Sequence, residues 1–114
     1  MDEGPFVERR FELEGRELVV RFYVPAKAPG GEFRCRYSIG WPEREVRGYA
    51  GGEDGVQALM LAMQAAHSDL VESDAYKAGR LTWCLQADLD LPPTWGVGPL
   101  YDVPPPPDMP SQTS

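Results

Sequence analysis

The sequence predicts an α+β domain in which an antiparallel sheet of four to five strands carries one amphipathic helix on one face, followed by a proline-rich C-terminal tail. Four segments before residue 51 alternate apolar and polar side chains with the period of two that is typical of half-buried strands. A helical period begins only at Val56. The order of four strands, a helix and a strand lacks the regular alternation of a parallel βα fold, so we expect a meander.

The first two strands are expected to form a hairpin. Along residues 6–13, Val7, Phe11 and Leu13 lie on one parity, with Arg9 as the one charged member of that side. Gly15 supplies the backbone freedom of a tight turn, and residues 18–24 resume the alternation. The two segments therefore have the pattern of antiparallel neighbours.

Residues 33–41 give the clearest strand pattern in the chain. Their apolar side chains occupy every second position, which predicts one packed face and one hydrated face: Phe33, Cys35, Tyr37, Ile39 and Trp41. Residues 44–50 form a weaker strand. Its inner parity holds Gly48 and Ala50, which we expect to leave room for a helix to pack across the sheet.

The helix is predicted to start after Asp54, since Gln57 three residues later completes a capping box. We expect its core-facing stripe to consist of residues at helical spacing, with alanines permitting a close approach: Val56, Leu59, Met60, Met63, His67 and Leu70. Residues 73–78 could add a turn before Gly79. Leu81, Trp83 and Leu85 then predict a last strand over residues 81–86.

We place the domain boundary after residue 90. Residues 1–90 form the predicted α+β domain, and residues 91–114 hold most of the chain's 12 prolines. Such a tail favours extended backbone, and we expect disorder beyond Val103. The run from Pro104 to Pro107 could dock in an aromatic groove, although a solvated terminus is the simpler interpretation.

The charge distribution favours a protein partner with a basic surface. The net charge is −7. Residues 1–50 are balanced, with nine Lys/Arg and nine Asp/Glu, whereas residues 51–114 have two and nine. We therefore expect no nucleic-acid partner, and the sequence has no apolar run long enough for a membrane span. An unprotected outer strand could also pair with a second copy of the chain, giving a homodimer through a sheet edge.

The sequence shows no set of catalytic residues, no spacing typical of metal ligands and no cofactor-binding motif. We therefore expect no catalytic site, no metal and no cofactor. His67 is the only histidine, and the nearest acid, Asp69, would point away from it on a helix. We interpret Asp88 and Asp90 as a solvated strand exit.

The two cysteines, Cys35 and Cys84, lie inside apolar runs and are expected to be buried free thiols of a cytoplasmic protein. A disulfide would require the two strands to be neighbours in suitable geometry.

The arginines of the predicted strands would share the hydrated sheet face with glutamates. Because the charges of this half balance, we expect cross-strand ion pairs rather than an anion-binding patch. The residues concerned are Arg10, Arg21, Arg34, Arg36, Arg44 and Arg47, with Glu8, Glu12, Glu17, Glu32 and Glu45.

The segment Cys35-Arg36-Tyr37-Ser38-Ile39-Gly40, followed by a short strand and then by Gly55-Val56-Gln57-Ala58-Leu59-Met60-Leu61-Ala62-Met63, resembles a family of small bacterial proteins defined as a domain of unknown function. The resemblance spans residues 10–90 and also includes the strand around Trp83. It implies the architecture and a bacterial source, and it brings no catalytic residue.

Two functional hypotheses remain. The first is a non-catalytic interaction module, inhibitor-like or immunity-like, that uses the acidic side of the helix or a sheet edge. The second is a domain with a small-molecule or weakly enzymatic site between helix and sheet, in the gap that Gly48 and Ala50 would leave. For the first hypothesis we single out as candidate surface residues Trp41, Asp54, Asp69, Glu72, Asp74 and Trp95.

Overall fold

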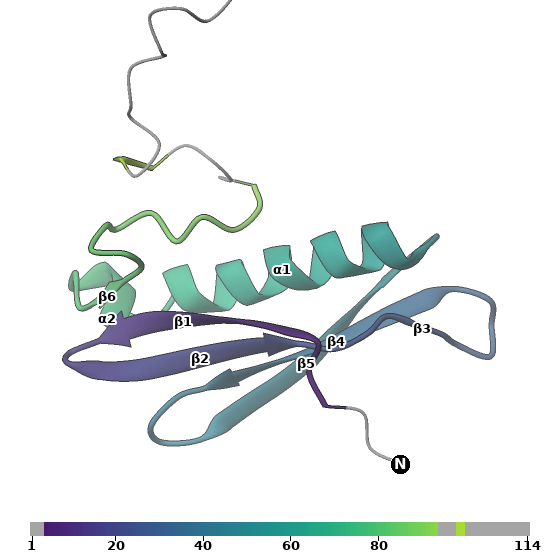
Figure 1. Ribbon diagram of the computed structural model, residues 1–114, viewed down its shortest axis with the longest axis horizontal. Coiled ribbons are helices and arrows are strands. Elements are labelled where there is room, and N and C mark those ends of the chain that lie inside the picture. Colours follow the sequence, from purple (N-terminus) through teal and green to yellow (C-terminus); the bar gives the residue numbers. More distant parts are fainter. Residues whose placement is uncertain (1–3, 94–97, 100–114) are drawn as a thin grey trace, which may run out of the picture.

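The computed structural model describes residues 4–93 and 98–99, and it shows the predicted α+β fold. One antiparallel sheet of six strands carries a long helix on one face (Figure 1). The elements are β1 (Val7–Leu13), β2 (Arg16–Phe22), β3 (Ala26–Lys27), β4 (Phe33–Gly40), β5 (Glu45–Gly52), α1 (Gly55–Val71), α2 (Asp74–Lys77) and β6 (Leu81–Thr82).

The strands follow a meander. Antiparallel pairing joins β1 to β2, β2 to β4 and β4 to β5, while the short β3 pairs with the other end of β4 and β6 pairs with β1. Leu13 lies opposite Arg16, so Glu14 and Gly15 form a two-residue turn. Both have positive φ, 53° and 81°, which is the backbone of a type I′ hairpin.

The predicted helix start is confirmed at Asp54. Its Oδ1 accepts a hydrogen bond from the Gln57 backbone N–H at 2.9 Å. Gln57 reaches back to accept from the backbone N–H of Glu53 at 2.7 Å, one residue before the position that a capping box uses.

The predicted core stripe of the helix is correct at Leu70 and wrong at its start. The buried residues of α1 are Ala58, Ala62, Ala66 and Leu70, a row spaced by four. Val56, expected as the first residue of the stripe, is 79% exposed, and Met60 is also exposed. Leu59 and Met63 are only partly buried against the core, so alanines make the closest contacts with the sheet.

Small residues on both partners explain this orientation. A Cβ on Gly52 would lie 2.6 Å from the backbone nitrogen of Ala58, so the start of α1 touches the end of β5. A Cβ on Gly48 would lie 2.7 Å from the ring of Tyr37. The room that Gly48 was expected to leave is therefore filled by the neighbouring tyrosine.

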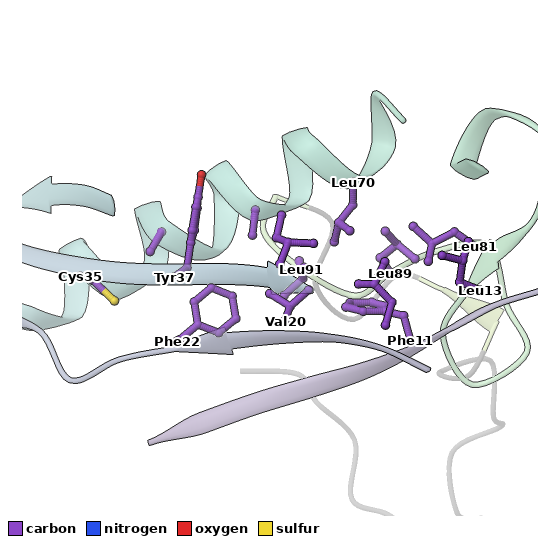
Figure 2. Packing of buried hydrophobic residues seen from close by; sticks show 14 of the residues in the cluster. Phe11, Leu13, Val20, Phe22, Cys35, Tyr37, Leu70, Leu81, Leu89 and Leu91 are labelled. Carbon is purple, nitrogen blue, oxygen red and sulfur yellow. The ribbon is translucent and has the colours of Figure 1, made fainter. Parts of the chain in front are cut away.

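Beside α1, an irregular segment covers the inner face of β1 and β2. Leu89 and Leu91 are buried in one cluster with Phe11 of β1 and Val20 of β2 (Figure 2). The core therefore includes Leu91, one residue into the predicted tail.

Arg9 fixes this segment. Its Nη1 donates to the backbone oxygens of Leu89 at 3.1 Å and Asp90 at 2.6 Å, and it lies 3.6 Å from the Asp90 carboxylate. The guanidinium also stacks over Trp83 at 4.3 Å. Asp90 is 5% exposed, so its interpretation as part of a solvated strand exit is wrong.

The last predicted strand is also corrected. β6 ends at Thr82, and the chain then turns back between Trp83 and Gln86. Cys84 and Leu85 have positive φ, 50° and 67°, and both are exposed. Cys84 is thus a surface thiol, while Cys35 is buried as expected, and neither forms a disulfide.

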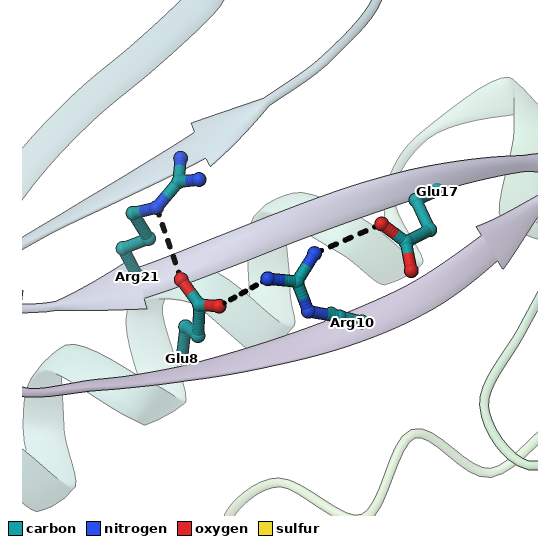
Figure 3. A network of polar contacts seen from close by, with 4 residues as sticks. All are labelled: Glu8, Arg10, Glu17 and Arg21. Carbon is teal, nitrogen blue, oxygen red and sulfur yellow. Dashed lines mark hydrogen bonds and ion pairs between the residues drawn. The ribbon is translucent and has the colours of Figure 1, made fainter.

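The hydrated face of the sheet shows the expected charge pairing. Arg21 bonds to Glu8 across β1 and β2 at 3.1 Å, and Arg10 bonds to Glu17 at 2.9 Å and to Glu8 at 2.6 Å (Figure 3). Further along, arginines pair two residues away within one segment, as Arg34 with Glu32 and Arg47 with Glu45.

The tail predictions, including the proline run, fall largely outside the described residues, and the boundary after residue 90 stays a prediction. No helix of the described residues has the length and apolarity that a membrane span requires.

Candidate functional site

A hollow lies where the turn between β4 and β5 meets the end of α1. Trp41 directly follows β4, and residues 42–44 lead into β5. The half-buried Trp41 lines a hollow of about 750 Å³ and a second one of about 300 Å³, which also share Arg44 and Ser73. We call this region the Trp41 surface; its residues are Leu13, Glu14, Arg16, Trp41, Pro42, Glu43, Arg44, Val46, Asp69, Glu72, Ser73, Asp74, Ala75 and Arg80.

The acidic residues of the surface are positioned by the break between α1 and α2. Ser73 makes this break, because its Oγ donates to the Leu70 oxygen at 2.6 Å and accepts from the Tyr76 N–H at 3.1 Å, capping α2. Glu72 and Asp74 flank this cap and are exposed. Neither forms an ion pair with any residue that the structure describes.

Asp69 is tied to the core through Tyr37. The Tyr37 hydroxyl points toward the helix (Figure 2) and hydrogen-bonds the Asp69 side chain. Burial of the phenol raises the pKa of Tyr37, and the charge and hydrogen bond of Asp69 raise it further. Asp69 is itself exposed, and it lines the smaller hollow together with Trp41.

Three arginines also line the larger hollow. Arg80, just before β6, forms an ion pair with Glu14 in the β1–β2 turn. Arg16 and Arg44 are exposed and form no ion pair with a described residue. The surface thus has an acidic side, at the end of α1, and a side of mixed charge, toward the β1–β2 turn.

Of the six residues singled out from the sequence, the structure brings four together: Trp41, Asp69, Glu72 and Asp74. Asp54 lies at the opposite end of α1, where its carboxylate caps the helix. Trp95 lies outside the described residues. Sequence reasoning missed Arg16 and Ser73 as neighbours of Trp41, and it assigned Arg44 to the cross-strand pairs.

The lengths of α1 and β5 could have indicated that the end of α1 lies near Trp41. α1 has 17 residues and β5 has eight, and both therefore span about 26 Å. A helix that turns back over a strand of equal length must end above the start of that strand. The end of α1 accordingly returns to Trp41 and the β4–β5 turn.

Burial shifts the pKa of two further titratable side chains, Cys35 and His67. Burial raises the pKa of the Cys35 thiol and lowers the pKa of His67, which Asp88 partly opposes by its charge. Both shifts favour the neutral form of the side chain. Among the described residues, no cluster of three or more potential metal ligands is present.

Neither a curated protein nor a solved structure matches this chain. A family model described as Domain of unknown function (DUF6968) matches residues 7–93, which include all the strands and helices of the described part of the chain. The resemblance to an uncharacterised domain family is confirmed, and the chain belongs to the DUF6968 family.

Proposed function

We propose that this chain is a non-catalytic protein-interaction module that binds a basic segment of a partner protein at the Trp41 surface. The observation that carries the proposal is a half-buried tryptophan beside three exposed carboxylates, from Asp69, Glu72 and Asp74. Tryptophan is among the residues that dominate binding energy at protein interfaces. Carboxylates that have no cation of their own attract a partner's lysine or arginine and guide its approach.

The arginines that line the larger hollow indicate which charges the partner segment carries. Arg44 borders both hollows, and Arg16 lines the larger one. A partner segment that lies along Trp41 therefore meets guanidinium groups as well as carboxylates. We infer a segment that carries an acidic or polar residue in addition to its basic residues.

The alternative, a small-molecule site between helix and sheet, has less support. The gap expected at Gly48 is filled by the ring of Tyr37, and the start of α1 contacts Gly52. The hollows at Trp41 are lined mainly by exposed charged side chains, whereas small-molecule pockets are mostly apolar and enclosed.

The proposal also covers the location of the protein, its source and the type of interaction module. The free thiols of Cys35 and Cys84, one of them exposed, fit a reducing compartment, which supports a cytoplasmic location. The bacterial source rests on the resemblance noted in the sequence. An inhibitor or immunity protein is the form of interaction module that we favour, and a toxin gene beside the gene for this chain would support it.

Chemical-shift mapping tests the proposal. The probes are synthetic peptides that contain arginine, lysine and leucine, each matched with a peptide in which glutamate replaces the basic residues. We expect the basic peptides to shift the Trp41 indole N–H and the amides of residues 69–74, and the acidic peptides to leave them unchanged. Equal shifts over the whole surface, or no shift at about 1 mM peptide, would refute the proposed site.

A further inference from the structure

One edge of the sheet is open over a whole strand. β5 pairs with β4 along all eight of its residues, from Glu45 to Gly52. No backbone group of β5 bonds to any other described segment. Natural proteins protect such edges with proline, lysine or a covering loop, because an open edge is a template for another strand. β5 contains neither proline nor lysine.

The opposite edge is better protected. β1 pairs with β6 at Glu12 and Leu13, and the backbone N–H of Glu14 donates to the oxygen of Arg80. The side chain of Arg9 reaches across to the segment at Leu89 and Asp90. β5 is therefore the longer unpaired edge in the described part of the sheet.

We propose that β5 pairs antiparallel with β5 of a second copy of this chain, about a two-fold axis at Gly48. A two-fold axis perpendicular to the sheet would relate the two β5 strands. Inner-facing residues of one copy lie opposite inner-facing residues of the other only if this axis passes through a residue rather than between two residues. An axis at Gly48 places Val46 opposite Ala50 of the second copy. It also aligns seven residues of each strand, from Glu45 to Gly51.

Side chains on the hydrated face are complementary in this register. Arg47 of each copy lies opposite Tyr49 of the other, which allows a cation–π contact on each side of the axis. Tyr49 is 59% exposed in the single chain, and its ring is already approached by Arg34 at 5.2 Å. An axis at Arg47 would instead bring two like charges together.

The helices fit the same arrangement. α1 packs over both β4 and β5, and neighbouring strands are about 4.8 Å apart. A symmetric copy would then place the two α1 axes about 10 Å apart, which is an ordinary distance for packed helices. The flank of α1 opposite His67 carries Leu61, Ala65 and Ser68 along its middle, and it ends at Asp69 and Glu72, which line a hollow together with Val46 of β5. His67 and its neighbour Asp88 lie on the other flank.

Sedimentation equilibrium of the full chain tests the dimer and its register. We expect a concentration-dependent dimer for the wild type. Tyr49→Glu would tighten it about fivefold, because each new carboxylate faces Arg47 of the other copy and, within its own chain, lies opposite Arg36. Adding Arg47→Glu to this variant would reverse the effect, because carboxylates then face each other.

A control separates this edge from the opposite one. Val7→Arg, at the opposite edge, should leave the dimer unchanged, and far-UV circular dichroism checks the fold of each variant. A wild-type chain that is monomeric at about 1 mM overturns the proposal. So does a dimer that Tyr49→Glu weakens or that Val7→Arg dissociates. Because the dimer does not involve Trp41, it can fail while peptide binding succeeds.

Discussion

The two halves of the sheet are covered in different ways. Over β4 and β5, the regular helix α1 approaches closely and contacts the sheet with alanines. Over β1 and β2, an irregular segment fills the space with large side chains, Leu89 and Leu91, and is fixed by Arg9. Close packing of a regular element depends on small residues, whereas an irregular cover depends on large apolar side chains and on polar groups that satisfy its backbone.

Leu89→Ala should give the largest loss of stability. Leu89 is 1% exposed, and its truncation leaves a cavity above β1 that the irregular segment cannot close. We expect the free energy of unfolding to fall by about 2–5 kcal/mol, measured by urea denaturation. Leu85→Ala is the matched control, because Leu85 is 87% exposed. Equal effects of the two changes would show that residues 88–91 do not belong to the core.

Gly52→Ala tests the close approach in the other half. The added Cβ would lie 2.6 Å from the backbone nitrogen of Ala58, so α1 would have to shift. Overpacking of this kind costs about 1–3 kcal/mol. Gly30→Ala, which meets nothing within 4 Å, should be neutral or slightly stabilising in the same thermal unfolding measurement. A neutral Gly52→Ala would contradict the tight contact between α1 and β5.

The regular half could be predicted from the sequence to a greater extent than the irregular half. Alternation along residues 33–41 correctly placed Cys35, Tyr37 and Ile39 in the core, and Asp54 with Gln57 marked the helix start. The core stripe of α1 was correct at Leu70 and wrong at Val56 and Met60, because hydrophobic periodicity favours large side chains and does not consider how closely the helix approaches the sheet.

The irregular half left weaker signals. Arg9 was visible as a charge on an apolar parity, but its partner, 81 residues away in sequence, has no periodicity that identifies it. The turn at Cys84 and Leu85 requires positive φ without glycine, which local sequence does not indicate. At the candidate site, Trp41 and the acids at the end of α1 were found separately, and their proximity depends on the matching lengths of α1 and β5.

The free energy of unfolding should depend on pH because of His67, which lies on the flank of α1 nearest Asp88. Burial lowers the pKa of His67 in the folded chain, so the unfolded chain binds a proton more readily. The free energy of unfolding should therefore fall as the pH drops below about 6.5, the ordinary pKa of histidine. His67→Gln should reduce this slope in urea denaturation at several pH values. An identical slope in both proteins would contradict the assigned environment of His67.

Val56→Ser should have the smallest effect. The helical period places Val56 in the core stripe, whereas the structure leaves it 79% exposed. Valine and serine also have similar helix propensities, so we expect a change within about 0.5 kcal/mol in thermal unfolding. A loss of more than about 1.5 kcal/mol would restore the orientation of α1 that hydrophobic periodicity indicates.

The central claim is that carboxylates at the end of α1, beside Trp41, bind a basic segment of a partner. The most direct test measures by calorimetry the affinity of a basic peptide for Glu72→Lys and for Glu53→Lys, two variants with the same change in net charge. Glu53 lies beside the N-cap at the far end of α1. We predict that Glu72→Lys weakens binding at least about tenfold more than Glu53→Lys does. Equal losses would show that only the overall charge matters and would contradict the assignment of the Trp41 surface.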